Sequence, residues 1–335
     1  YQGGHVEYLQ YMLDMLRDNG GEKIRVFAGG GGVIIPEEKV LLEDYGVTRI
    51  FTPEDGQQLG LQGMIENTIS LSQFDPSDDA PVHLESLSAG DTRALAHALS
   101  AVENGCLDES LARALASESL ADVPVLGITG TGGAGKSSLT DELVLRLRMG
   151  LGDELKIAIL AVDPTRKRTG GALLGDRIRM NAIDHPNVFM RSIATRESSG
   201  EVPDYMATMV DLCKCSGFEL VIVETPGIGQ GDVGITDLVD RSLYVMTPEF
   251  GAQSQLEKID MLDFADVIAI NKFDRKGATD AYRDVCKQVQ RNREAFADKP
   301  ETMPVFGTMA SRFNDDGMTA LYQEILAQLL DAGLR

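Results

Sequence analysis

VPVLGITGTGGAGKS, residues 123–137, is the most informative segment of this 335-residue chain. It begins with a continuous apolar run over 123–129, which is typical of a strand buried on both faces of a parallel sheet. From Gly130 to Ser137 it matches the pattern G-x-x-x-x-G-K-[ST], and a helical pattern over 135–149 follows. Strand, glycine-rich loop and helix in this order form the context in which the pattern binds phosphate. We therefore expect a phosphate-binding domain of the α/β class.

Apolar runs alternate with helical patterns from this segment to the end of the chain. The runs predict strands at 123–129, 156–163, 188–193, 220–224, 242–247, 266–271 and 305–308. The patterns between them predict helices at 135–149, 203–216, 253–263, 278–297 and 316–331. Such alternation predicts a mostly parallel sheet with helices on its faces.

Two further regions precede this domain, which we place at 122–335. Residues 1–75 carry a shorter alternation, with helices predicted at 5–20, 37–45 and 56–71 and strands at 23–28 and 48–51. The polar, proline-bounded segment 75–81 separates them from leucines at helical spacing over 83–119. We interpret 76–121 as a helical linker.

Composition limits the classes of partner. There are 31 Lys and Arg against 52 Asp and Glu, a net charge of −21, which argues against binding of nucleic-acid polymers or anionic membranes. No apolar run approaches the ~18 residues of a membrane span. Four cysteines are too few for a disulfide framework and favour a reducing cytoplasm. The chain opens on YQGGH without Met and enters a helix at once, so we expect it to begin inside a domain.

The glycine-rich loop predicts how phosphates are held. Its glycines let backbone N–H groups turn inward, and the helix that follows adds its positive end. Lys136 is expected to reach the β- and γ-phosphates, with catalytic effect, and the Ser137 hydroxyl to ligate Mg²⁺. The expected phosphate-binding residues are Gly132, Gly133, Ala134, Gly135, Lys136, Ser137 and Ser138. The alternative is a glycine-rich turn that carries Lys-Ser by chance.

Asn271, Lys272, Phe273 and Asp274 form an N-K-x-D loop at a strand end, 135 residues after Lys136. In GTP-binding proteins such a loop reads guanine, because the Asp carboxylate accepts hydrogen bonds from ring N1–H and the 2-amino group. Adenine lacks these donors and would leave a desolvated carboxylate unpaired, at a cost of about 1–3 kcal/mol or more. We therefore expect GTP and GDP as ligands. An exposed charged turn is the alternative.

Carboxylates at strand ends are the candidates for metal binding. Glu224, in Glu-Thr-Pro-Gly, stands where many GTPases carry Asp, and Asp163 ends another predicted strand. Asp176 follows a cationic run at 166–168, and Arg179 lies one helical turn further as a candidate phosphate partner. Asp176 and Arg179 also fit a simple i,i+3 surface pair.

The position after Gly227 predicts slow hydrolysis. It holds Ile228 rather than a glutamine that orients water, and Gln230 is displaced. We expect Lys136, Asp163 and Gln230 to act in catalysis and a partner to accelerate turnover.

Four motifs in order, GTGGAGKS, VDPTRKRTGGALLGD, VETPGIGQGD and NKFD, resemble the G-protein chaperones of adenosylcobalamin-dependent acyl-CoA mutases. The resemblance covers 123–335 and implies a P-loop GTPase. It also implies a metal shell made by Ser137, Asp163, Asp176, Glu224, Thr225 and the backbone of Val162.

Residues 1–75 are similar to the second half of a flavodoxin-like, cobalamin-binding domain, in the YQGGH start, the glycine run and YGVTRIFTPEDG. That family's Asp-x-His-x-x-Gly motif, which supplies the cobalt ligand, has no counterpart here, so we interpret His5 as a helix-start residue. The glycines that would line the slot for the nucleotide tail of cobalamin are Gly29, Gly30, Gly31 and Gly32.

A cobalamin domain followed by this GTPase resembles the fused isobutyryl-CoA mutases. The resemblance implies adenosylcobalamin as a cofactor and an acyl-CoA mutase domain as the partner, and we expect a homo-oligomer. GTP hydrolysis would gate cofactor loading and protection, while the whole protein converts isobutyryl-CoA to n-butyryl-CoA.

Two other classes of function compete with this interpretation. One is a signalling ATPase with a receiver-like front domain, although residues 23–28 end in glycines where a receiver needs acidic side chains. The other is a binding module with a vestigial nucleotide site, against which the intact Lys136, Ser137 and Glu224 count.

Overall fold

The chain forms two compact units, Tyr1–Asp79 and Ala80–Arg335, which are described separately. This is a computed structural model. It describes residues 3–29, 32–73, 82–117, 122–163, 178, 180–195, 202–226, 234–251, 256–257 and 259–335. No helix in these ranges combines the length and the apolar character that crossing a bilayer requires.

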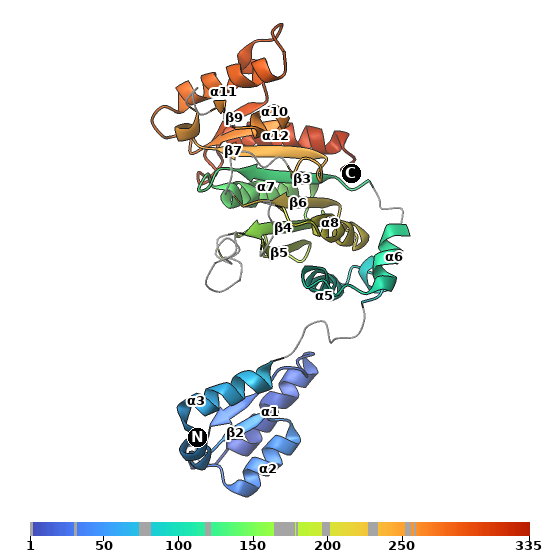
Figure 1. Ribbon diagram of the computed structural model, residues 1–335, viewed down its shortest axis with the longest axis vertical. Coiled ribbons are helices and arrows are strands. Elements are labelled where there is room, and N and C mark those ends of the chain that lie inside the picture. Colours follow the sequence, from blue (N-terminus) through green and yellow to red (C-terminus); the bar gives the residue numbers. More distant parts are fainter. Residues whose placement is uncertain are drawn as a thin grey trace. The chain divides into compact units, whose positions relative to one another are not determined.

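A seven-stranded sheet is the centre of the larger unit (Figure 1). Its strands are β3 (Val125–Gly130), β4 (Ile157–Asp163), β5 (Val188–Ala194), β6 (Leu220–Glu224), β7 (Arg241–Met246), β8 (Val267–Asn271) and β9 (Val305–Thr308). They pair in the order β5-β4-β6-β3-β7-β8-β9, and every pair is parallel. The predicted α/β class is confirmed, and all strand carboxyl ends lie at one edge of the sheet.

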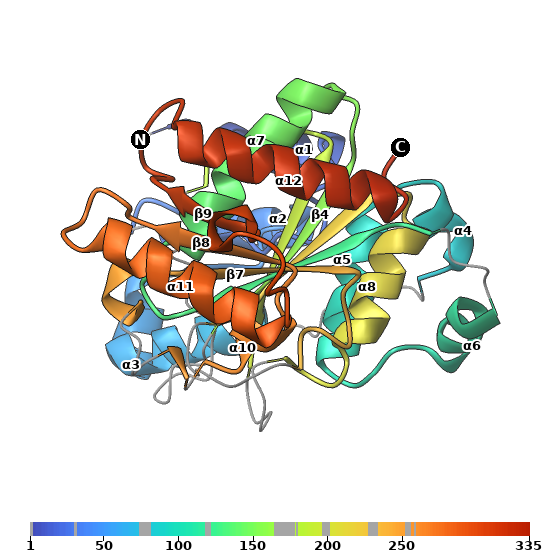
Figure 2. The same ribbon diagram turned by 90° about the horizontal axis from the view of Figure 1, so that it is seen from above.

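Helices cover both faces of this sheet (Figure 2). They are α7 (Lys136–Leu151), α8 (Met206–Cys215), α10 (Met261–Phe264), α11 (Ala278–Asn292) and α12 (Asp316–Asp331), with short 3-10 helices at Pro248–Phe250 and Pro300–Thr302. In β3, Val125 packs toward α8 and α11, whereas Leu126 packs toward α7 and α12. Of the helix expected at 253–263, the described residues include Met261–Phe264 and omit 252–255 and 258.

Three helices that precede the large sheet in sequence belong to the larger unit: α4 (Leu84–Ser88), α5 (Thr92–Glu103) and α6 (Glu109–Ser117). The described part of the segment 83–119 is helical as its leucine spacing predicts, and Gly90 and Gly105, with φ angles of 77° and 68°, divide it into three helices. Their leucines, including fully buried Leu95 and Leu99, join the core beside α8. The segment expected as a linker is therefore an extra layer of the larger unit.

The smaller unit contains α1 (His5–Asp18), β1 (Phe27–Gly29), α2 (Pro36–Tyr45), β2 (Arg49–Phe51) and α3 (Pro53–Ser72). The two strands pair in parallel, which confirms the expected alternation. Its core consists of Leu9, Leu13, Val26, Leu42, Val47 and Ile50. No side chain of α3 is buried, and Gly60 breaks its helical geometry with φ 63°.

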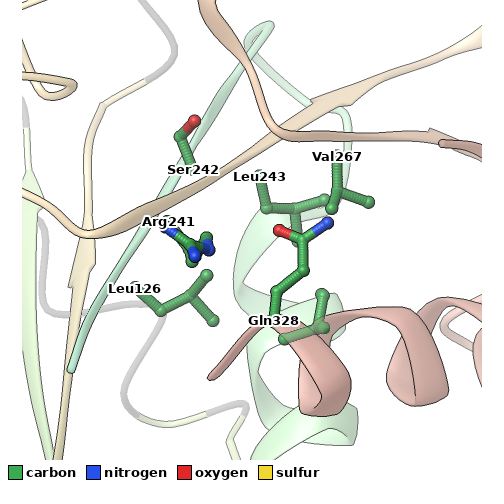
Figure 3. A pocket seen from close by; sticks show the side chains of 7 residues that line it. Leu126, Arg241, Ser242, Leu243, Val267 and Gln328 are labelled. Carbon is green, nitrogen blue, oxygen red and sulfur yellow. The ribbon is translucent and has the colours of Figure 1, made fainter. Parts of the chain in front are cut away.

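The edge of the large sheet at the amino ends of the strands carries a shallow crevice (Figure 3). Leu126, Arg241 and Val267 line it from three strands, and Gln328 lies across it from α12. This crevice is too narrow to admit a water molecule. Candidate site residues of the larger unit are found instead at the carboxyl edge.

Candidate nucleotide-binding site

The register of the sheet brings the predicted residues of three strands to one place. Glu224 at the end of β6 pairs with Ile128 of β3 on one side and Ala161 of β4 on the other. Gly130 and Asp163 each follow these partners by two residues, so the phosphate loop and both carboxylates share the carboxyl edge. The strand register thus brings these predicted residues to one edge of the sheet.

The phosphate loop needs its glycines for two different reasons. Gly130 has φ 145°, and a Cβ there would lie 1.9 Å from the Val245 carbonyl oxygen of β7. Gly135 has φ 87°, a left-handed conformation that side chains rarely adopt, directly before α7. Lys136 is buried inside the loop, with Nζ 3.2 Å from the Gly130 carbonyl and 3.5 Å from that of Thr131. The ammonium group of Lys136 is therefore held by backbone carbonyls of the loop, at the start of α7.

The carboxylate of Glu224 lies next to the start of α7 and contacts two hydroxyl groups of that helix. The Ser137 hydroxyl donates to Glu224 Oε1 at 2.7 Å, and the Thr140 hydroxyl lies 2.9 Å from Oε2. Glu224 and Asp163 are each only 6% exposed. Asp163 follows buried Val162 at the end of β4.

Thr225 is buried beside this group, where its hydroxyl donates to Thr129 at 2.8 Å. Mg²⁺ prefers oxygen ligands such as hydroxyls and carboxylates, so the side chains of Ser137, Glu224 and Asp163 fit that ion chemically. Within the described ranges, no group of three or more His, Cys, Asp or Glu side chains gathers as a metal cluster.

The N-K-x-D loop is hydrogen-bonded directly to the phosphate loop. Asn271 Nδ2 donates to the Ala134 carbonyl at 2.8 Å, and Lys272 Nζ donates to the Gly133 carbonyl at 2.7 Å. Lys272 has φ 58°, which is unusual for a residue with a side chain. Two motifs that lie far apart in sequence are thus held in one site.

Phe273, the third residue of the N-K-x-D motif, anchors the loop by packing on the protein. Phe273 packs on Gly307 of β9, where a Cβ would lie 2.5 Å from the ring, and its ring meets that of Tyr282 edge-on at 6.2 Å. Asp274, by contrast, is exposed. The loop therefore fixes Phe273 in the protein and presents the carboxylate of Asp274 to solvent, as recognition of a base requires.

An ion pair joins the neighbouring loop after β7 to this one. Glu249 pairs with Arg275, which directly follows the motif. The Thr247 hydroxyl, the backbone at Glu249 and Arg275 hold the pKa of Glu249 at about 2. The pair therefore stays charged at neutral pH.

The remaining predicted site residues lie in both units, and several of them are not among the described residues. Ser138 is exposed, and Gly132 is exposed at the loop tip. In the smaller unit, Gly29 ends β1, and Gly32 has φ 83° near Pro53. Asp176, Arg179, Gln230, Gly30 and Gly31 lie outside the described residues.

Sequence reasoning missed three contributors to the site. Thr308 and the backbone N–H of Ala310 both donate to Asn271 Oδ1, at 3.3 and 3.1 Å. Thr308 is the last residue of β9 and Ala310 lies two residues beyond it, so the predicted strand end was the signal that could have found them. Thr140 was also missed, although it is a polar residue between buried Leu139 and Leu143 on the apolar face of α7.

Comparison with known proteins identifies the family. Residues 95–331 match the family described as the methylmalonyl-CoA mutase-associated GTPase MeaB. The chain belongs to the MeaB family. A MeaB-family chain is a GTPase, so the guanine nucleotide expected from the N-K-x-D loop is confirmed, and the ATPase alternative loses its support.

This MeaB-family chain is similar to a part of longer proteins. It is 61% identical to a fused isobutyryl-CoA mutase of Cupriavidus metallidurans and 58% identical to one of Nocardia farcinica, in each case over all 335 residues. The chain spans only 31% of the length of either relative. The crystal structure of a LAO/AO transport system kinase, 25% identical, aligns with a TM-score of 0.50 over 75% of this chain and 76% of that one.

Proposed function

We propose that this GTPase is a built-in chaperone of an adenosylcobalamin-dependent acyl-CoA mutase. In this role, Mg²⁺-dependent GTP hydrolysis gates the loading and protection of the cofactor. The observation that carries the nucleotide part is the pair of hydrogen bonds from Asn271 and Lys272 to the phosphate loop. The mutase part rests on the names of the relatives, which also suggest that the whole protein converts isobutyryl-CoA to n-butyryl-CoA.

Each group has a defined task in this proposal. Backbone amides over 132–137 bind phosphate oxygens, and Lys136 neutralises charge that develops during transfer. Asp274 accepts hydrogen bonds from guanine. Ser137, Glu224 and Asp163 would hold Mg²⁺, with Thr225 and the backbone of Val162 beside them. Bound Mg²⁺ would neutralise phosphate charge.

Groups outside the described residues complete the proposed site. They are Asp176 for the metal, Arg179 for the phosphates and Gln230 for water. We keep the expectation that intrinsic hydrolysis is slow and that a partner accelerates it.

The smaller unit is proposed to contact cobalamin through its glycine-rich loop. Gly29 and Gly32 flank that loop, where the lack of side chains leaves room for a bulky group. His5 Nε2 donates a hydrogen bond to the Glu38 carboxylate at 2.9 Å, which supports a structural role rather than cobalt ligation. The four cysteines are free, which supports a reducing compartment such as the cytoplasm.

Calorimetric titration tests the nucleotide part. GDP is expected to bind and ADP not to bind, and radiolabelled GTP is expected to be hydrolysed slowly by the unmodified chain and not by Lys136→Ala. Steady-state turnover of tens per second in the isolated chain would contradict the need for a partner. A spectroscopic titration with cobalamin tests the front unit, for which we expect weak or no binding without a cobalt-ligating histidine.

A further inference from the structure

We infer that Thr140 is a positioning residue for Glu224, fixing the far oxygen of a carboxylate that faces the metal. The inference rests on the proposed function, in which Glu224 contributes to Mg²⁺ binding. Glu224 occupies a position where a shorter aspartate is common, and Thr140 provides the contact that the longer side chain requires. In this inference Thr140 holds the carboxylate of Glu224 in position, and Glu224 contributes to Mg²⁺ binding.

The contacts show how both carboxylate oxygens are held by one helix. Ser137 and Thr140 lie three residues apart on α7, so their side chains share a face. Ser137 donates to Oε1 at 2.7 Å, and the Thr140 hydroxyl lies 2.9 Å from Oε2. The side chain of Glu224 is thereby fixed between strand β6 and the first two turns of α7.

Because both side chains are buried, the hydrogen bond between the Thr140 hydroxyl and Glu224 cannot easily be replaced by one to water. Thr140 is 0% exposed and Glu224 6%, so a carboxylate oxygen that loses this donor gains little from water. The Thr140 hydroxyl also lies 3.0 Å from the Lys136 carbonyl, but it has only one proton to donate. A bond to a charged carboxylate is roughly twice as strong as one to a neutral carbonyl, so the proton goes to Glu224.

Side-chain length links the two residues. Replacing Glu224 by Asp withdraws the carboxylate by one carbon–carbon bond, about 1.5 Å, which takes a 2.9 Å contact beyond hydrogen-bond range. Thr140 is therefore useful to a glutamate at 224 and of no use to an aspartate. This distinguishes a positioning role from general packing, which would not depend on residue 224.

The test measures nucleotide binding as a function of Mg²⁺. Fluorescent methylanthraniloyl-GDP is titrated with the whole chain over a range of Mg²⁺ concentrations and in EDTA, for the unmodified chain, Thr140→Val and Thr140→Ser. Thr140→Val removes the hydroxyl at nearly constant volume and is expected to raise the Mg²⁺ concentration at the midpoint about tenfold. Its affinity in EDTA stays unchanged, and Thr140→Ser, which retains the hydroxyl, stays near the unmodified chain.

A double-mutant cycle completes the experiment. In a Glu224→Asp background, Thr140→Val is expected to cause no further shift of the midpoint. An unchanged midpoint in Thr140→Val, an equal loss in EDTA, or an additive effect with Glu224→Asp would overturn the inference. If the unmodified chain itself shows no Mg²⁺ dependence, the proposed metal role fails first, and that result is seen without any variant. Thermal unfolding of each variant shows that it is folded.

Discussion

At the scale of single residues, the phosphate loop depends on a position where only hydrogen fits. A side chain at Gly130 would collide with the Val245 carbonyl, and the φ of 145° adds strain. We expect Gly130→Ala to lower the free energy of unfolding by about 3 kcal/mol or more, because neither backbone can withdraw from a paired strand. Gly133→Ala is the matched control, since φ is 72° but nothing lies within 4 Å, so only a left-handed penalty of about 1–2 kcal/mol remains. Equal losses in urea denaturation would contradict this account.

In the proposed function, recognition of the base also rests on one residue, Asp274. Asp274→Asn replaces an acceptor of two hydrogen bonds by a group that also donates, which suits xanthine better than guanine. We expect GDP affinity to fall by about 100-fold and xanthosine diphosphate to bind more tightly than GDP. Calorimetric titration of both nucleotides measures the change. Asp274 is exposed, so the melting temperature should not move, and unchanged GDP affinity would refute the assigned role.

At the scale of elements, the start of α3 carries a pH-sensitive cap. The Thr52 backbone N–H, together with Lys39 and the Thr52 hydroxyl, lowers the pKa of Asp55 from 3.8 to about 2. The folded state thus favours the ionised carboxylate, so its stabilisation is complete above pH 4 and is lost as the pH falls toward 2.

Unfolding of the smaller unit at several pH values tests this cap. We expect a loss of about 2 kcal/mol across the window, and Asp55→Asn should remove both that stabilisation and its pH dependence. A variant whose stability still follows pH as in the unmodified chain would show that another group is responsible.

Elements were predictable where a local pattern and the three-dimensional fold agree. The strand Leu220–Glu224 has the bounds that its apolar run predicts. The stretch 83–119 was harder, because helical spacing of leucines does not reveal whether they face a partner sheet or solvent. Leu95 and Leu99 are core residues, and part of the core around them comes from α8, more than 100 residues later in the sequence.

Some residues of the site could likewise be predicted from the sequence, and others could not. Lys136, Asn271 and Lys272 belong to motifs whose spacing carries the chemistry, and the side chains of all three donate to backbone carbonyls of the phosphate loop. Thr140 and Thr308 belong to no motif, and their roles come from the register of strands and the rotation of one helix. Such roles depend on tertiary packing that the linear sequence does not display.

At the scale of the whole molecule, the two units are expected to unfold separately. The smaller unit has a core of six buried apolar residues around two strands, whereas the larger contains the seven-stranded sheet and the nucleotide site. Calorimetry should therefore give two transitions. GDP at about 100 times its Kd should stabilise only the larger unit, by about 2.7 kcal/mol, and raise that transition by about 5–10 °C. A single transition would mean that the units unfold as one, and equal shifts of two transitions would contradict stabilisation of the larger unit alone.

The strand order has a consequence for how the protein is made. β3, the first strand of its sheet to leave the ribosome, lies between β6 and β7, which are synthesised about 90–120 residues later. The phosphate loop emerges early but has no rigid support until those strands arrive, and its contact with Asn271 forms later still. A nascent chain therefore cannot complete its site for guanine nucleotide until the N-K-x-D loop, 135 residues after Lys136, has been synthesised and has reached the phosphate loop.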